Sequence, residues 1–242
     1  MPPKVHPLTL YSSARNQLGS LRKRLARPGP IVRHDDFDGR REVVVLLQGF
    51  SHARNVWDVM EDRLRYDGFS VLSFNHTWHV LPSSARPLET AAEQVADKLH
   101  RLRARFELDG FHIVGHSRGG LIGRRLIETY GAGCCAKSLI TLGTAHRGTM
   151  GAVIGNVLRG VSDDAFPDHV PLTSITSASD WITPSWQSAV TPRTPTHTMN
   201  NVRVQGVGHV ELLWSPVVYR EVRAALLDAT ELWSKRGDAE RK

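Results

Sequence analysis

Short apolar runs alternate along this chain with longer segments in which apolar residues recur every three or four positions. The runs are rich in β-branched and aliphatic residues, as in strands that are buried on both faces of a sheet. Six runs predict strands, at 43–47, 69–74, 111–114, 138–142, 172–177 and 202–204. The helical spacing predicts helices over 88–106, after residue 117 and over about 216–233. Strands that alternate with helices predict an α/β fold with a central, mostly parallel sheet and helices on both faces.

Residues 1–42 lack this alternation and form a basic, proline-containing segment with leucines spaced as in one short helix. We expect an N-terminal arm over 1–42 that packs on a single α/β domain over 43–242, because a chain of 242 residues can bury one sizeable core. The arm could contact a membrane or lipid surface through its positive charge. The alternative is an ordinary solvated basic surface.

Composition narrows the class of protein only slightly. The chain is 40% hydrophobic and 23% charged, with a net charge of +7, which is ordinary for a globular domain. Positive charge alone does not identify a nucleic-acid binder, and we expect no nucleic-acid partner. No apolar stretch approaches the roughly 20 residues that span a bilayer, and no signal-peptide core is visible near the N-terminus. With two adjacent cysteines, these features predict a cytoplasmic location, or a secreted one if the chain is already processed.

The strongest chemical motif is Gly115-His116-Ser117-Arg118-Gly119, which follows the third predicted strand and opens a helix. This is the setting of a nucleophile elbow, a sharp turn that exposes a serine. The turn requires small residues two positions before and after the serine, and the N-terminus of the following helix favours the negative charge that develops there. We therefore predict Ser117 as nucleophile, supported by Gly115, His116 and Gly119.

A serine nucleophile needs a base and an acid, which in this kind of fold follow it in the order acid, then histidine. His209 lies just past the last predicted strand, in Gly206-Val207-Gly208-His209-Val210, and its flanking glycines let the chain turn back over the sheet. Asp180 comes directly after the fifth predicted strand and would orient that histidine. Three other aspartates compete from a polar loop: Asp163, Asp164 and Asp168. The prediction is a triad of Ser117, Asp180 and His209.

The negative charge of the tetrahedral intermediate needs two backbone N–H donors, which together form an oxyanion hole. One donor is expected from Arg118, the residue after the nucleophile. The second is expected from the loop after the first strand, and we choose Phe50. Gly49 permits a close approach of that loop, and the Gln48 side chain could brace it.

These motifs resemble those of the bacterial triacylglycerol lipases and esterases of the α/β-hydrolase superfamily, especially the small, nearly lidless lipases. The resemblance spans roughly residues 43–225. It implies an α/β-hydrolase fold with a minimal cap or none, so that 147–170 is either a small cap or a linking helix. Two positions depart from the lipase pattern: Gln48 replaces a usual histidine, and Arg118 stands where methionine or glutamine is common. The Arg118 side chain could alter the substrate pocket or point outward to a carboxylate.

The residues and the resemblance together predict a serine hydrolase that cleaves small-molecule or lipid carboxylic esters through an acyl-enzyme intermediate. Acyltransferase or thioesterase chemistry on the same triad is the alternative, because the motifs do not specify which group accepts the acyl chain. A hydrolase-fold binding protein without activity fits less well with three intact triad members. No metal or organic cofactor is expected.

Overall fold

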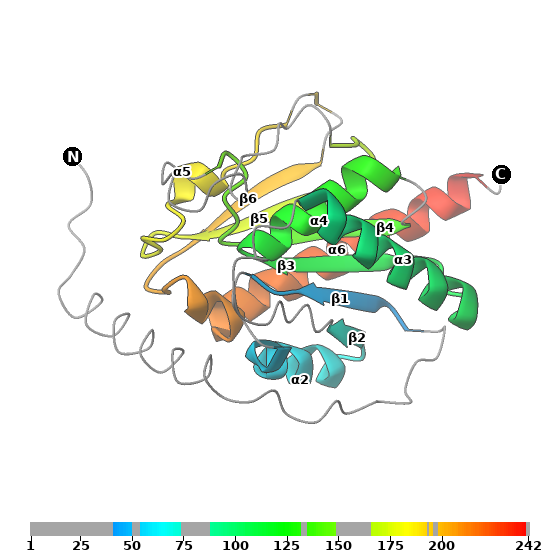
Figure 1. Ribbon diagram of the computed structural model, residues 1–242, viewed down its shortest axis with the longest axis horizontal. Helices are drawn as coiled ribbons and strands as arrows, with labels where there is room; N and C mark the ends of the chain where they lie inside the picture. The colour runs from blue at the N-terminus through cyan, green and yellow to red at the C-terminus, as the bar shows by residue number, and fades with distance from the viewer. Residues whose placement is uncertain are drawn as a thin grey trace.

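The computed structural model describes residues 41–49, 54–73, 88–131, 135–148, 166–192, 194–195 and 198–240. Its strands form one six-stranded sheet with the order β2-β1-β3-β4-β5-β6, and each neighbouring pair is parallel (Figure 1). The strands are β1 (Val43–Leu47), β2 (Ser70–Ser73), β3 (Phe111–His116), β4 (Ala136–Leu142), β5 (Leu172–Ser177) and β6 (Met199–Val204). This sheet confirms the predicted α/β class. The predicted arm, apart from its last two residues, lies outside the described ranges.

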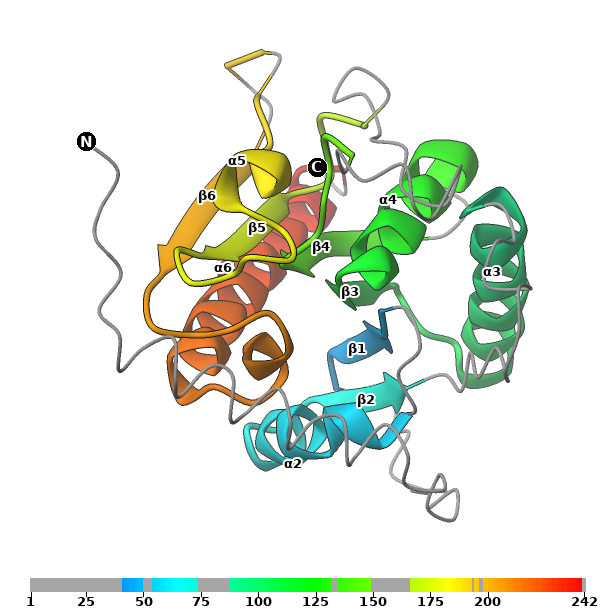
Figure 2. The same ribbon diagram turned by 60° about the vertical axis from the view of Figure 1, so that its left-hand side comes forward.

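Helices cover both faces of the sheet, as predicted. They are η1 (Arg54–Trp57), α2 (Asp58–Tyr66), α3 (Leu88–Phe106), α4 (Arg118–Tyr130), α5 (Ser185–Ser188), η6 (Val210–Leu213) and α6 (Pro216–Glu240). Odd-numbered residues of β1 pack with α3 and α4, whereas its even-numbered residues pack with α2 and α6. Figures 1 and 2 show α3 and α4 on one side of the sheet and α6 on the other. The alternation along one strand thus divides the core into two layers.

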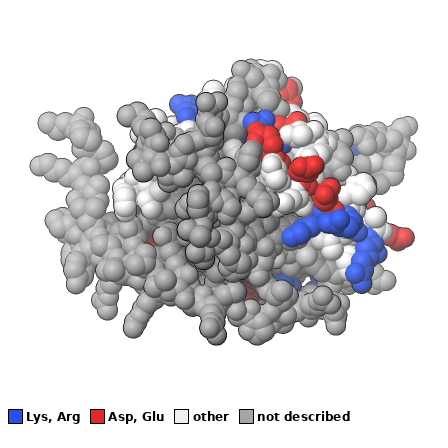
Figure 3. Space-filling model, viewed as in Figure 1, with Lys and Arg blue, Asp and Glu red and all other residues white. Residues whose placement is uncertain are grey.

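The outer helix α3 has one buried face and one face exposed to solvent. Its buried face consists of small and aliphatic residues such as Ala91, Val95 and Leu99. Its outer face carries side chains of both charges, which lie at the right of Figure 3. Such a helix covers a core and stays hydrated on its other side. Within the described ranges, no helix has the length and apolar character needed to cross a bilayer.

Four elements extend beyond the predicted limits: β3 continues to His116, β4 begins at Ala136, and β6 and α6 are also longer than predicted. β6 begins at Met199, whereas the prediction begins at 202. The prediction misses this start because Asn200 and Asn201 are exposed on an edge strand and show no apolar alternation. α6 continues past Trp233 to Glu240, and an ion pair between Glu231 and Lys235 (2.6 Å) spans the start of this extension. A pattern of apolar residues cannot indicate the extensions of β6 and α6.

The direction of winding changes between β1 and β3. The chain leaves β1 toward α2 on one face and leaves β3 toward α4 on the opposite face. In open α/β sheets, ligands bind outside the carboxyl ends of the strands at such a switch point. Here Gly49 and Ser117 flank that point, and a Cβ added to Gly49 would lie 2.9 Å from the Ser117 Cβ.

Candidate active site

Ser117 forms the turn between the end of β3 and the first residue of α4. Its backbone has φ 53° and ψ −122°, a conformation that residues other than glycine seldom adopt. Its N–H donates to Leu142 O (2.9 Å), and its carbonyl accepts from the Thr144 hydroxyl (2.9 Å). Both partners lie at the end of β4 or just after it, so the neighbouring strand holds this strained turn in place.

Close packing explains two glycines around the serine. A Cβ at Gly119 would lie 2.0 Å from Leu47 O, and one at Gly115 would lie 2.5 Å from a backbone Cα of α4. Both atoms belong to backbone, which cannot move aside as a flexible side chain could. The elbow therefore has room only for glycine at these positions, which lets α4 start against the end of β1.

Asp180 lies just after β5, at the end of a tight turn, and is buried. Its Oδ1 accepts the backbone N–H of Ile182 (2.9 Å) and of Thr183 (2.8 Å). Hydrogen bonds from two donors to one oxygen fix the plane of the carboxylate. The other oxygen, Oδ2, is then left to face the loop that follows β6.

His209 lies on that loop, between β6 and η6, and its Nδ1 is 2.6 Å from Asp180 Oδ2. The Nδ1–H donates to the carboxylate, so the tautomer that this contact favours has Nε2 as its basic nitrogen. Gly206, with φ 70°, turns the chain back from β6 toward the sheet. The structure thus brings together the predicted acid and the predicted base.

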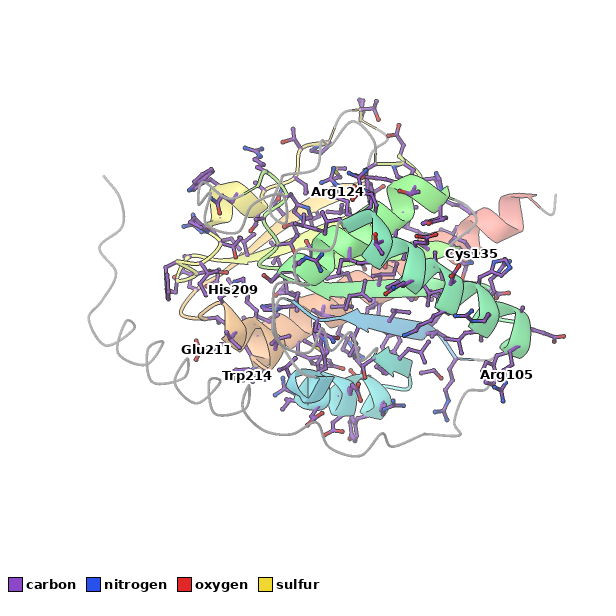
Figure 4. The ribbon with its side chains drawn as sticks, in the orientation of Figure 1. Arg105, Arg124, Cys135, His209, Glu211 and Trp214 are labelled. Atoms are coloured by element: carbon purple, nitrogen blue, oxygen red, sulfur yellow. The ribbon has the colours of Figure 1, made fainter. Side chains whose placement is uncertain are left out.

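Gly143, which follows β4, joins the serine turn to this acid–base pair. Its neighbour Leu142 accepts the N–H of Ser117. A Cβ at Gly143 would lie 2.9 Å from Asp180 Oδ2 and 3.0 Å from His209 Nδ1. The three predicted triad residues therefore lie along one edge of the sheet, past the carboxyl ends of β3, β5 and β6. Figure 4 shows His209 at this edge.

Two further side chains brace the histidine. Thr183 Oγ1 donates to Gly143 O (3.0 Å) and lies 2.9 Å from His209 Nδ1, so it accepts a share of the Nδ1 proton. His116 Nε2 donates to His209 O (3.0 Å), and the two rings lie 4.7 Å apart. His116 is among the predicted supporting residues, whereas Thr183 is not. Its place three residues after an aspartate in a turn is the pattern that could have indicated it.

Of the two predicted oxyanion donors, Arg118 lies within the described residues and Phe50 lies outside them. Arg118 is the first residue of α4, and its side chain is only 5% exposed, so the guanidinium does not extend outward into solvent. Burial lowers its pKa. Gln48 is also buried, and its carbonyl approaches Gly119, but the loop that it was expected to brace lies outside the described residues. The same holds for 149–165, most of the segment predicted as a cap or linking helix.

A buried histidine lies in the same loop that holds the elbow. His146 Nε2 donates to Thr141 Oγ1 (2.9 Å), and its Nδ1 faces Arg124 Nη1 (3.4 Å). Arg124 projects from α4 (Figure 4) and pairs with Glu128 (2.9 Å). Burial, aided by the charge of Arg124, lowers the pKa of His146 to about 3. This imidazole is therefore neutral near neutral pH and has a structural role.

We expect the free energy of unfolding to fall as the pH drops below 6.5, the ordinary pKa of histidine. Unfolded His146 takes up a proton there, whereas folded His146 does not until about pH 3, so each pH unit between costs about 1.4 kcal/mol. Burial also lowers the pKa of His112, which adds to the loss. Urea unfolding at about pH 7 and about pH 5.5 measures the slope. His146→Gln, whose amide can still reach Thr141, should show a shallower slope; equal slopes contradict this account.

A parallel sheet with a serine elbow at a switch point, followed in order by an acid and a histidine, defines an α/β hydrolase. Solved structures share the fold. An esterase from Thermogutta terrifontis matches with a TM-score of 0.60 and 18% identity over 78% of this chain and 90% of its own. A putative non-heme bromoperoxidase from Mycobacterium tuberculosis reaches 0.64 at 14% identity, over 84% and 98%. The monoacylglycerol lipase of Paleococcus ferrophilus reaches 0.56 at 16% identity, over 79% and 94%.

A family model for palmitoyl protein thioesterases matches residues 43–198, and the chain belongs to this family. The matched stretch contains Ser117 and Asp180, and His209 lies beyond its end. A sequence search of curated proteins finds no match. The chain is therefore an enzyme of the class that hydrolyses esters or thioesters.

Proposed function

We propose that this chain is a serine thioesterase that hydrolyses long-chain acyl thioesters, and the matching oxyesters, through Ser117, His209 and Asp180. The observation that carries the proposal is the buried 2.6 Å contact between Asp180 and His209, beside a serine held at positive φ. The family match supports a thioester with a long acyl chain as the preferred substrate. The lipase-like motifs around the acid and the histidine favour a second candidate, an esterase that prefers alcohol esters.

In the proposed mechanism, His209 Nε2 takes the proton of Ser117 as Oγ attacks the acyl carbonyl carbon. The N–H groups of Arg118 and Phe50 hold the oxyanion, and removing one such donor costs about 3 kcal/mol of barrier. Collapse breaks the carbon–sulfur bond, the leaving thiolate takes the proton from His209, and the acyl group stays on Ser117. Water then loses a proton to His209, attacks the acyl-enzyme and releases the carboxylic acid as Ser117 regains its proton. The Asp180 carboxylate stabilises the imidazolium in both halves.

A panel of matched substrates tests this function. Thioesters and nitrophenyl esters with the same acyl groups, from butyryl to palmitoyl, are compared by kcat/KM. We expect the value to rise about fourfold per buried methylene until the acyl pocket is filled, with thioesters ahead of oxyesters of equal chain length. A fluorophosphonate probe should label the protein, and peptide mass spectrometry should place the label on Ser117.

Each other outcome identifies a different function. Faster turnover of every oxyester would point to the esterase, and acyl transfer to an added alcohol in preference to water would point to an acyltransferase. Absence of both labelling and turnover would contradict the serine mechanism itself.

A further inference from the structure

Three large apolar side chains stand exposed just after Asp180, two on the loop that follows it and one on the short helix α5. Trp181 is 67% exposed, Ile182 41% and Trp186 55%. Only five other large apolar side chains of the described residues are exposed, and they are scattered over α2, α4 and α6. We call Trp181, Ile182 and Trp186 the apolar tip. Exposed apolar groups that gather in one place mark a surface that contacts something other than water.

The apolar tip lies in a part of the chain that carries almost no charge. From Val170 to Pro192 the only charged residue is Asp180, and it is buried. In Figure 3 the described surface at the left edge, over the loop that precedes α5 in Figure 1, is likewise uncharged. The chain as a whole is 23% charged, so this stretch differs sharply from the rest of the surface. The exposed Arg147 side chain reaches this stretch from the loop after β4 and donates to Thr191 Oγ1 (3.0 Å), so the surface carries little charge, which fits a partner that offers an apolar phase.

Hydrogen bonds hold the backbone beneath the apolar tip. Besides the bonds from Ile182 and Thr183 to Asp180, the Gln187 N–H donates to Pro184 O (2.8 Å). Gln187 O in turn accepts the N–H of Arg147 (3.0 Å) from the loop after β4. Trp181 and Ile182 on the loop and Trp186 on α5 are therefore presented on a braced backbone, close in sequence to the acid of the proposed active site.

The size of the apolar tip limits what can cover it. From the exposed fractions and the area of such side chains, the three groups offer on the order of 400 Å². A stable interface with a second copy of the chain would need about 800 Å² from each partner. Insertion into a lipid surface has no such threshold, and indole rings favour the boundary between acyl chains and water. The area and chemistry therefore favour a bilayer over a second protein.

We propose that the apolar tip docks the enzyme on the uncharged interfacial region of a lipid bilayer. Docking by Trp181, Ile182 and Trp186 places the carboxyl edge of the sheet, with Asp180 and His209, against the phase that holds long acyl chains. This benefit rests on the proposed function, because only an enzyme for lipid-borne acyl groups gains from it. The docking itself does not depend on catalysis.

Sedimentation with phosphatidylcholine vesicles tests the proposal, with Ser117→Ala as background so that no acyl group is cleaved. We expect the double variant Trp181→Ser, Trp186→Ser to lower the partition coefficient at least about tenfold. Tyr66→Ser is the matched control, because Tyr66 is 92% exposed on α2, away from the site, and its loss should leave partitioning unchanged. Thermal melting and fluorophosphonate labelling of the same substitutions in the native serine background check that each protein is folded.

Salt and self-association separate the remaining explanations. Binding through the apolar tip should persist between about 0.1 M and about 0.5 M salt, whereas binding through basic residues would be screened. Loss of binding at high salt, or equal binding of the double variant, overturns the proposal. So does a tip-dependent dimer in sedimentation velocity, which would assign the surface to a second copy. Because vesicle binding is measured without Ser117, failure of the proposed catalytic mechanism would leave this result intact.

Discussion

Replacing Ser117 by alanine is expected to lower kcat/KM by about 10⁴-fold or more for every substrate that the enzyme turns over. The only atom removed is the nucleophilic oxygen. The bonds that hold the turn run from the Ser117 N–H and to its carbonyl, so alanine keeps both. The backbone at φ 53° is strained for serine and alanine alike. The variant should therefore fold as the native chain does, which thermal unfolding measures beside the kinetics.

Ser234→Ala is the matched control for this substitution. Ser234 lies exposed on α6, where its hydroxyl donates to Thr230 O within the helix (3.1 Å). Its loss should leave both activity and fluorophosphonate labelling unchanged. If Ser117→Ala kept turnover, another residue would have to be the nucleophile, and the proposed acyl-enzyme would be wrong.

Asp180→Asn is expected to lower kcat by about 10⁴-fold. The reason lies in the two N–H groups of Ile182 and Thr183, which hold one oxygen of the side chain. Only the oxygen of an asparagine amide can accept them, so the NH₂ group must face His209 Nδ1. That nitrogen then becomes an acceptor, and the proton moves to Nε2, where it prevents the histidine from taking the proton of the serine. Steady-state kinetics with a soluble short-chain thioester measures the loss.

Substitutions of Thr183 calibrate this result. Thr183→Val removes the hydroxyl that lies 2.9 Å from His209 Nδ1 but keeps the volume and the backbone N–H. A loss of about tenfold in kcat, restored by Thr183→Ser, is expected for a bond that positions the ring without setting its tautomer. If Asp180→Asn lost no more than Thr183→Val, the acid would have to be another carboxylate.

The sequence predicts the central strands well because they are buried on both faces. The run Val43–Leu47 has no polar residue, and its limits match β1 without error. The edge strand β6 is half exposed, so its first residues carry no such pattern. The sequence does not predict the burial of Arg124, because an arginine on a helix is expected to face solvent. Its side chain is buried between Glu128, His146 and the ring of Phe166, contacts that only the folded chain creates.

The residues of the candidate site likewise include some that the sequence predicts and one, Thr183, that it does not. Ser117, Asp180 and His209 each directly follow a predicted strand, or lie just past one, and the carboxyl ends of parallel strands meet at one edge. Their placement therefore follows from topology. Thr183 looks like any loop threonine, because its bond to the carbonyl of Gly143 depends on the register between β4 and β5. That register is a property of the assembled sheet and has no local pattern in the chain.

The contacts of Gly143 also bear on how this region moves. Its carbonyl accepts a hydrogen bond from the Thr183 hydroxyl, and a side chain on Gly143 would clash with both Asp180 and His209. The loops after β4, β5 and β6 are therefore packed closely together. The loop after β5 is bonded to both of the others, so none of the three can open without breaking a bond to at least one neighbour. Amide protons across all three loops should therefore exchange with solvent in one concerted opening rather than independently. Asp180 and His209 would then reach or leave their positions together, with no long-lived state in which only one of them is in place.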